Sequence, residues 1–390
     1  MRIELPISKS IANRLLILQA IHGDEPAGSP TALASWGALM TVSACGVPND
    51  ARIVGCFDLP EDVQILHRAL TTLHHSTQRY TTLNLSNCGT AMRFLTAYAA
   101  QLENIVTVLD GVERMRHRPI GQLVDALREI GADIEYLGEE GFPPLRIKGC
   151  ILDKHRIITL DNPQSTQFVS ALLLIGANVQ TDSTSPYITL TRALIEQYAL
   201  ALSPNRLSPI VLEKDWSSAA FWYEYVALHG GEITLPGIYR NSLQGDKVVA
   251  DIFSHLGVHT TYTAEGIILS PIAYSEASNS PLSGRPIAAQ AASRSKILVL
   301  DFGNCPDLYP AVALTCERLG IELHATGVES LPLKESDRLR AVREHRTDHD
   351  HRMAMALLIA GYEVDDTACI SKSYPQFIEH FRRINTLKLQ

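Results

Sequence analysis

The sequence has no surplus of positive charge. Its 34 Lys and Arg residues stand against 42 Asp and Glu residues, which gives 34 − 42 = −8 at pH 7. A chain without a net positive field has little to hold a nucleic-acid backbone or an anionic membrane surface, so neither partner is expected. Any binding of anions must depend on a local concentration of cations.

Closely spaced cysteines and long apolar runs are also lacking. The seven cysteines are never closer than 11 positions, which excludes a CxxC redox pair and a zinc knuckle. Dispersed cysteines are typical of buried thiols in a reducing compartment. No stretch approaches the ~18 apolar residues of a membrane span, and the first residues lack the apolar core of a secretion signal. We therefore expect a cytoplasmic protein.

The sequence does contain enough apolar material for two domains, and a recurring α/β pattern. Hydrophobic residues make up 46% of the 390 residues, a length beyond what one hydrophobic core usually serves. About six times, the last at 357–364, an amphipathic run precedes a glycine suited to a left-handed helix end, and then an alternating strand. Two copies align at an offset of 126, pairing Asp125 with Asp251, Gly131 with Gly257 and Tyr136 with Tyr262. An internally repeated α/β chain is expected, although such units also occur in unrelated α/β proteins.

Polar clusters come directly before several apolar helical runs. They lie at Ser8–Ser10, Asn87–Thr90, Gln164–Gln167, Asp215–Ser218 and Asp307. A helix N-terminus offers unpaired N–H groups and a partial positive charge, which can hold phosphate or carboxylate. The same residue types are ordinary N-caps, so capping explains any single cluster best. Several clusters interleaved with charged motifs favour an anion-binding cleft.

Cations are concentrated in a few short motifs. Three arginines fall within five positions of the stretch 111–120, and 334–338 mixes cations and carboxylates at helical spacing. A solvated basic face and intrahelical ion pairs are the simplest explanations. The functional alternative is that Lys334 and Arg338, one helical turn apart, share a face and bind an anion. With Arg352 and Lys372 nearby in sequence, the motifs indicate a substrate with several negative charges.

Nine motifs, taken in order, resemble one known family. They are Ser8–Arg14, Asn87–Leu95, Glu113–Leu127, Gln164–Leu173, Asp215–Ala219, Asn241–Asp246, Pro306–Asp307, Lys334–Leu339 and Asp350–Met355. The sequence resembles the 5-enolpyruvylshikimate-3-phosphate synthase family of enolpyruvyl transferases. The match runs from Ser8 to about Pro375, and nine motifs in family order are far more specific than one alone.

The resemblance implies an α/β (α+β) fold of two lobes, built from repeated βαβαββ units as an inside-out α/β barrel. Residues 9–212 would form one lobe, and residues 1–8 plus 213–390 the other, with a cleft between them. The reaction would transfer the enolpyruvyl group of phosphoenolpyruvate to the 5-hydroxyl of shikimate 3-phosphate and release phosphate. No metal or organic cofactor would be needed, and the chain would work as a monomer.

The resemblance also assigns site residues. The catalytic residues would be Asp307 as the base for the hydroxyl, Glu335 as the acid for the methylene carbon, Lys334 and Lys9. The residues that bind the substrates would be Lys9, Ser10, Arg14, Gly89, Arg118, Ser165, Thr166, Gln167, Thr184, Asp307, Ser330, Lys334, Arg338, Arg352 and Lys372. A glycine at position 89 would leave the phosphoenolpyruvate pocket open and predicts sensitivity to glyphosate. Addition across an enol ether needs a base at the oxygen and an acid at the carbon, which these residue types supply.

Some stretches depart from the family pattern. The connections 187–213 and 338–350 are shorter than expected, which would remove strands and expose sheet edges. Our first interpretation is that residues have been left out of the sequence at these two places and that the numbering continues across them. The second is that the protein is a shortened variant of the family. The stretch 22–62 is divergent. Ser330 stands where the family has Asn, and Thr184 and Thr166 where it has Ser.

Three other functions remain open at this point. The first is the related transferase that acts on UDP-N-acetylglucosamine, although that enzyme usually carries a catalytic Cys near the Arg118 region. The second is a metal-dependent protein built on His345, His349, Asp350 and His351, whose spacing could seat zinc. The third is a catalytically inactive, ligand-binding relative, which the two short connections would favour.

Overall fold

The computed structural model describes residues 1–23, 40–41, 59–75, 79–202, 210–272 and 297–388. Among these, the chain separates into two compact units, one comprising Met1–Ser8 and the residues from Glu213 onward, the other the residues between Lys9 and Leu212. They are called the 213–390 unit and the 9–212 unit below. The proline-rich stretch at 24–30, most of the one at 270–286 and most of the divergent stretch 22–62 lie outside the described residues.

The 9–212 unit alternates helices and short strands. Its elements are α1 (Lys9–His22), β1 (Met40–Thr41), α3 (Glu61–His75), β2 (Tyr80–Asn84), α4 (Gly89–Ala100), β3 (Val106–Asp110), α5 (Glu113–Arg116), α6 (Gly121–Glu129), β4 (Asp133–Tyr136), β5 (Leu145–Lys148), β6 (Ile157–Thr159), α7 (Thr166–Leu174), β7 (Asn178–Gln180), α8 (Pro186–Leu202) and β8 (Ile210–Val211). Strands β1 and β8 pair in parallel.

The 213–390 unit follows the same pattern. Its elements are α9 (Trp216–His229), β9 (Ile233–Pro236), η2 (Gly245–Val248), α10 (Val249–His255), β10 (Val258–Tyr262), β11 (Gly266–Pro271), β12 (Ile297–Asp301), η3 (Pro306–Leu308), α12 (Tyr309–Leu319), β13 (Glu322–Thr326), η4 (Leu331–Leu333), α13 (Arg338–Glu344), α14 (His351–Ala360), η5 (Ala368–Lys372) and α15 (Phe377–Lys388). No helix in the described part of the chain is long and apolar enough to cross a membrane.

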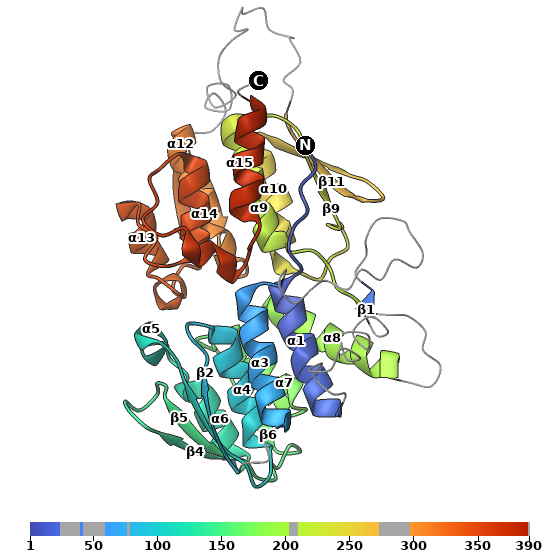
Figure 1. Ribbon diagram of the computed structural model, residues 1–390, viewed down its shortest axis with the longest axis vertical. Coiled ribbons are helices and arrows are strands. Elements are labelled where there is room, and N and C mark those ends of the chain that lie inside the picture. Colours follow the sequence, from blue (N-terminus) through green and yellow to red (C-terminus); the bar gives the residue numbers. More distant parts are fainter. Residues whose placement is uncertain (24–39, 42–58, 76–78, 203–209, 273–296, 389–390) are drawn as a thin grey trace, which may run out of the picture. The chain divides into compact units, whose positions relative to one another are not determined.

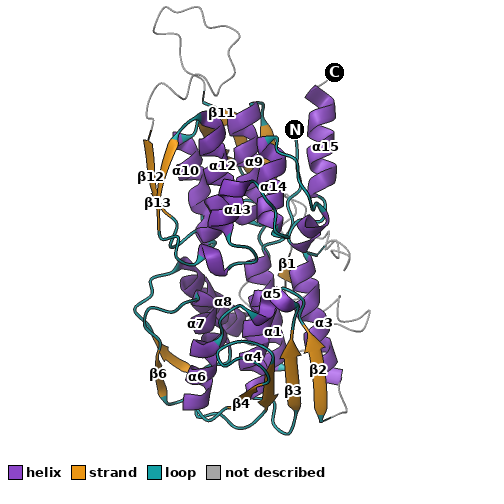
Figure 2. Ribbon diagram, turned by 90° about the vertical axis from the view of Figure 1, so that its left-hand side faces the viewer, coloured by secondary structure: helices purple, strands orange, loops and turns teal. Residues whose placement is uncertain are grey.

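Among the described residues, each unit contains one complete βαβαββ repeat. In the 9–212 unit the strands lie in the order β2-β3-β5-β4, with β2 and β3 parallel and the other pairs antiparallel. Figure 2 shows β2 and β3 running side by side. In the 213–390 unit Arg2 forms a parallel bridge to Thr234 of β9, which gives the same order with β9, β11 and β10. Gly131 and Gly257, with φ of 103° and 89°, each turn the chain from helix into strand. The repeat predicted from the 126-residue offset is confirmed.

Each unit also contains a repeat that stops early. Strands β6 and β7, and likewise β12 and β13, form parallel pairs with no further strand among the described residues. After β13 the chain passes through α13 and then reaches α14 within six residues, without a gap. In this sequence six residues join the two helices, so the connection is short here and carries no strand. In 187–213 the chain forms α8, and residues 203–209 lie outside the described residues.

The helices, rather than the strands, form the core of each unit. Nearly every residue of α4 is buried, and so is nearly every residue of α9 and α14. A helix that is apolar on all sides must be surrounded by other elements. In the 213–390 unit α9 packs against α10, α12 and α14 (Figure 1). The α/β fold with helices inside, predicted from the family resemblance, is confirmed.

Two local predictions are wrong. The strand expected at Tyr362–Val364 is irregular, because the chain after α14 leaves the helix at Gly361 and runs to η5 as a loop. Lys334 and Arg338 do not lie on one helix, since Lys334 has extended backbone after η4 and Arg338 is the first residue of α13. Intrahelical ion pairs therefore do not explain this motif.

Candidate active site

In the 213–390 unit eight charged or ionisable side chains gather at the starts and ends of helical segments. We call them the Asp307 cluster: Asp307, Lys334, Glu335, Arg338, Asp350, His351, Arg352 and Lys372. Asp307 lies in η3 before α12, Arg338 begins α13, and Arg352 is the second residue of α14. Asp350 is the N-cap of α14, where its carboxylate accepts a hydrogen bond from the Arg352 amide at 2.9 Å. Four cations against three carboxylates leave the cluster with an excess of positive charge.

Three cations surround the carboxylate of Asp307. Arg338 Nη1 lies 2.8 Å from Oδ1, Arg352 Nη2 lies 2.9 Å from Oδ2, and Lys334 Nζ lies 3.8 Å from Oδ1. Burial by itself raises the pKa of Asp307, but Arg352, Lys334 and Arg338 together hold it well below its ordinary value. The three cations therefore favour the ionised form of Asp307.

A buried ion pair fixes Arg338. Its Nε donates to Asp350 Oδ2 at 2.8 Å, and both side chains are nearly inaccessible, at 2% and 0% exposed. The Ser336 hydroxyl donates to the same oxygen at 3.2 Å. Burial raises the pKa of Asp350 and the Arg338 charge outweighs it, so the pKa lies below its usual range. Because Arg338 also donates to Asp307, Asp350 orients the guanidinium that touches the candidate base.

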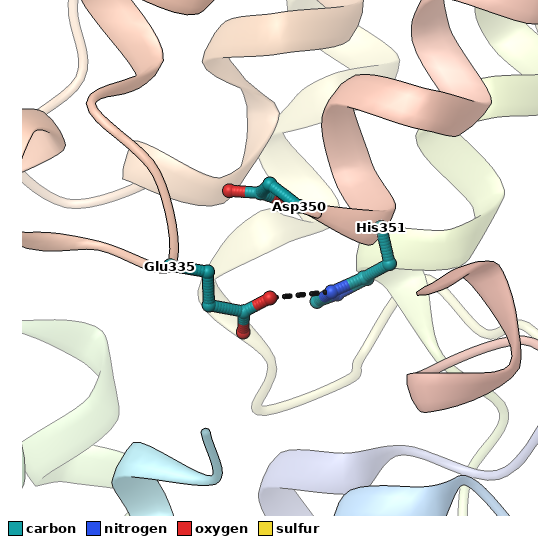
Figure 3. Close-up of side chains that lie close together, drawn as sticks. All are labelled: Glu335, Asp350 and His351. Carbon is teal, nitrogen blue, oxygen red and sulfur yellow. Dashed lines mark hydrogen bonds and ion pairs between the residues drawn. The ribbon is translucent and has the colours of Figure 1, made fainter. Parts of the chain in front are cut away.

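The second carboxylate, Glu335, has its own pair of partners. His351 Nδ1 lies 2.8 Å from Glu335 Oε2, and Lys372 Nζ lies 3.0 Å from the same oxygen. Figure 3 shows the Glu335 carboxylate and the His351 ring facing each other with Asp350 beside them. His351 is fully buried and Glu335 is only 10% exposed. Glu335 thus lies in a position where a proton can reach it from His351 or from Lys372.

The zinc site considered from the sequence does not form. Among the described residues, the metal-competent group is Glu335, Asp350 and His351, without His345 or His349. His345 pairs with Glu317 at 2.8 Å, and His349 with Asp366 at 2.7 Å. Lys372 and Arg338 already neutralise the two carboxylates of the group, so these donors fit a bound cation poorly.

A further acid lies beside the cluster and was not predicted as a site residue. Asp246 in η2 is buried and accepts a short hydrogen bond from the Ser217 hydroxyl. Burial and the negative charge of Asp307 raise the pKa of Asp246 to about 6, although Arg352 and Ser217 lower it. Asp246 and Ser217 both belong to sequence motifs named above, but nothing in those motifs distinguished them from ordinary N-cap residues.

In the 9–212 unit the start of α4 carries a second cluster. We call it the Gly89 cluster: Asn87, Gly89, Thr90, Arg93, Arg118 and Gln167. A Cβ on Gly89 would lie 2.4 Å from Arg93 Nη1 and 2.5 Å from Arg118 Nη2. A side chain at position 89 would therefore meet two guanidinium groups, those of Arg93 and Arg118.

Hydrogen bonds to neutral oxygens hold these guanidinium groups. Arg93 Nη1 donates to Gln167 Oε1 at 3.1 Å, and Gln167 Nε2 donates to Thr90 Oγ1 at 2.9 Å. Arg118 Nη1 donates to the Asn87 carbonyl at 3.2 Å. Burial, and then the positive charge of Arg118, lower the pKa of Arg93 well below its ordinary value. Two repelling cations at a helix N-terminus are suited to an anion.

Lys9 lies at the start of α1 and pairs with a buried acid. Its Nζ is 2.8 Å from Asp62 Oδ2, with the two side chains 16% and 4% exposed. Asp62 also links to α4, because the Cys88 thiol donates to its backbone carbonyl. Sequence reasoning missed Asp62. No motif pointed to it, because it is one of two acidic residues in the first turn of α3 and its partner Lys9 is distant in the sequence. Arg93 had a signal, one helical turn after Gly89 within the same motif.

The other predicted residues differ in how exposed they are. Arg14 is 2% exposed, and its guanidinium donates to Thr191, Ser170, Tyr187 and the Ser10 carbonyl, which ties α1 to α7 and α8. Ser165 is the N-cap of α7 and accepts from the Gln167 amide, so the capping explanation holds for it. Ser10 and Thr166 are half-buried, Thr184 is exposed before α8, and Ser330 is half-buried at the start of η4.

The chain is similar to known proteins along most of its length. The sequence matches the family described as EPSP synthase (3-phosphoshikimate 1-carboxyvinyltransferase) over residues 58–345 and 342–381. A 3-phosphoshikimate 1-carboxyvinyltransferase from Bacteroides fragilis (strain ATCC 25285) is 33% identical over 440 aligned residues, which cover 98% of this chain and 94% of that protein. One of the same name from Colwellia psychrerythraea is 28% identical, covering 98% and 96%.

Two solved structures of EPSP synthase from Acinetobacter baumannii share the fold. Their TM-scores are 0.60 and 0.58 at 19% and 18% identity, and each match covers 98% of this chain and 95% of the other. The alignment with the Bacteroides protein also has gaps in this chain, because 98% of 390 is about 382 residues and 440 − 382 leaves about 58 positions. Extensive matches of sequence and fold along nearly the whole chain show that it belongs to the EPSP synthase family.

Proposed function

We propose that this chain transfers the enolpyruvyl group of phosphoenolpyruvate to the 5-hydroxyl of shikimate 3-phosphate and releases phosphate. The observation that carries the proposal is a carboxylate, Asp307, enclosed by three cations at 2.8, 2.9 and 3.8 Å, with a second carboxylate, Glu335, in the same cluster. One group can take a proton from oxygen and the other can give one to carbon, which is what addition to an enol ether requires.

The cations provide the binding energy for phosphoenolpyruvate. Arg338, Arg352 and Lys372 clamp its phosphate and carboxylate, and Gly89 and Arg118 contact it from the 9–212 unit. Lys9 touches both substrates. Shikimate 3-phosphate is held by Ser10, Arg14, Ser165, Thr166, Gln167, Thr184, Asp307, Ser330 and Lys334. The two units with these residue sets, 9–212 and 1–8 plus 213–390, act as the two functional lobes.

Substrate binding strengthens Asp307 as a base. While Arg338, Arg352 and Lys334 pair with Asp307, its low pKa makes it a weak proton acceptor. An incoming phosphate or carboxylate competes for the same three cations, so their hold on Asp307 weakens and its pKa rises towards the value a base needs. The cluster therefore suits a reaction in which the base becomes effective only after the anionic substrate has bound.

Glu335 completes the proton transfers. As the shikimate oxygen attacks C2 of phosphoenolpyruvate, Asp307 takes the hydroxyl proton and Glu335 delivers a proton to C3. In the second step a proton leaves the new methyl group for Glu335 and the C–O bond to phosphate breaks. His351 and Lys372, at 2.8 and 3.0 Å from Glu335, can supply its proton, and Lys334 supports the transfers at Asp307.

Phosphate release tests this assignment. Purified protein should release phosphate from phosphoenolpyruvate only when shikimate 3-phosphate is present, and EDTA should not stop it. UDP-N-acetylglucosamine serves as the rival acceptor, and release with it instead would favour the related transferase. Binding of both substrates without release would favour an inactive relative.

Three properties accompany the proposal. The chain works as a monomer, which sedimentation at working concentration tests. It acts in the cytoplasm, which fractionation of the source cells tests. Because position 89 is glycine, glyphosate should compete with phosphoenolpyruvate, which inhibition kinetics test.

A further inference from the structure

The short connection between α13 and α14 has an unusual backbone. Six residues, 345–350, join the two helices, and three of them have positive φ without being glycine: His345 at 50°, Asp348 at 46° and His349 at 59°. Such residues persist where surrounding contacts over-determine the backbone. The connection is therefore held in place by its contacts.

Every side chain of this connection has a partner. His345 pairs with Glu317, Arg346 with Asp348, Asp348 also with Arg340, and His349 with Asp366, and these side chains are partly or largely exposed. Exposed pairs contribute little to stability. The two buried residues are Thr347 and Asp350, both 0% exposed, so the contacts of these two decide how the connection is held.

Thr347 anchors the connection to the loop after α14. Its hydroxyl donates to Asp365 Oδ1 at 2.5 Å, and its amide points to the same oxygen at 3.4 Å. The Thr347 hydroxyl is the largest cause of a lowered pKa at Asp365. Thr347 is buried and Asp365 is exposed, so this hydrogen bond is partly buried. A hydrogen bond to a carboxylate is stronger than one between neutral groups.

A continuous series of contacts runs from Thr347 to Asp307. The Thr347 carbonyl accepts the Asp350 amide at 2.9 Å. The Asp350 carboxylate accepts from Arg338 Nε at 2.8 Å, and Arg338 Nη1 donates to Asp307 at 2.8 Å. A change at Thr347 can thus reach Asp307 through two residues.

We propose that Thr347 and Asp365 are positioning residues, which set the Asp350 carboxylate and thereby the Arg338 guanidinium at Asp307. The inference rests on the proposed function for its kinetic consequence, but its structural content is independent of the reaction. Thr347 and Asp365 lie outside the Asp307 cluster. In this proposal their hydrogen bond holds the short connection 345–350, and with it Asp350, in place.

The test compares Thr347→Val, which removes only the hydroxyl, with Thr347→Ser, which keeps it. His349→Gln is the matched control, since it removes an exposed pair of the same connection. In Thr347→Val we expect kcat to fall about tenfold, the scale of one partly buried hydrogen bond to a carboxylate. The acidic limb of the kcat/KM profile should move to higher pH, because a displaced Arg338 holds the Asp307 pKa down less. Thr347→Ser and His349→Gln should stay within about threefold of the parent chain.

Amide hydrogen exchange provides a readout that needs no turnover. In Thr347→Val the amides of Asp350 and Arg352 should exchange at least about tenfold faster than in the parent chain. Asp365→Asn should also make these amides exchange faster, and it replaces Thr347→Val in the test if that variant does not fold. Faster exchange in a chain without transferase activity would sink the proposed function and leave the positioning role standing. Parent-like exchange and kinetics in Thr347→Val, or equal effects of Thr347→Val and His349→Gln, would overturn the inference.

Discussion

Replacing Asp307 by alanine should separate catalysis from binding. In the proposed mechanism Asp307 is the base, so its loss should lower kcat by about 10²- to 10⁴-fold, the usual range for a general base. In the same proposal Asp307 competes with phosphoenolpyruvate for three cations. At an effective dielectric constant of about 20, its attractions at 2.8, 2.9 and 3.8 Å come to roughly 4 to 6 kcal/mol each before desolvation is counted.

Most of that attraction is offset by the cost of burying charges, so only a fraction emerges on binding. We expect the dissociation constant for phosphoenolpyruvate, measured by calorimetry, to fall about tenfold in Asp307→Ala, which corresponds to ~1.4 kcal/mol. Asp307→Asn is the control that keeps the side-chain volume while removing the charge, and it should show the same split. A variant that loses turnover and also binds phosphoenolpyruvate more weakly would refute the competition argument.

Further predictions concern single residues in both units. Gly89→Ala should raise the KM for phosphoenolpyruvate and the inhibition constant of glyphosate by about tenfold or more, because its Cβ meets Arg93 and Arg118 within 2.5 Å; unchanged constants would show that both arginines give way freely. In the proposed mechanism Glu335 is the proton donor, so Glu335→Gln should lower kcat by about 10²-fold or more in steady-state kinetics; a kcat within about threefold of the parent value would contradict that role. Glu224 is fully buried and without a hydrogen-bond partner among the described residues, and burial raises its pKa well above the usual value. The folded state favours the protonated form of Glu224, so the stability that this group contributes is fully present below its unfolded pKa. The free energy of unfolding then falls by about 1.4 kcal/mol per pH unit as pH rises towards the folded pKa. The gain in melting temperature of Glu224→Gln over the parent chain should therefore be larger at pH 8 than at pH 5, and an equal gain at both would contradict a neutral buried acid.

Periodicity and glycine position predicted the repeat because both are local. A glycine suited to positive φ, such as Gly131 or Gly257, marks a helix end locally, so five of the six predicted helix–Gly–strand units form as expected. Gly361 has the same geometry, but the chain after it bonds through Asp365 to Thr347 instead of entering a sheet, and that long-range contact is not encoded in the spacing.

The sequence indicated which charged residues belong to the candidate site better than it indicated which residues they pair with. The motifs named Asp307, Arg338 and Arg352, and the structure brings them together. They did not reveal that Lys334 reaches Asp307 from an extended segment, or that Asp62 pairs with Lys9. Those pairings depend on residues distant in sequence, which local patterns cannot connect.

Phosphorus NMR of the protein with phosphoenolpyruvate and shikimate 3-phosphate tests the central claim most directly. The account predicts that the phosphoenolpyruvate signal declines as inorganic phosphate grows in equal amount, while the phosphate ester of shikimate persists, and that Asp307→Ala stops the change. Loss of phosphate from the shikimate ester, or an unchanged spectrum with the parent chain, would contradict it.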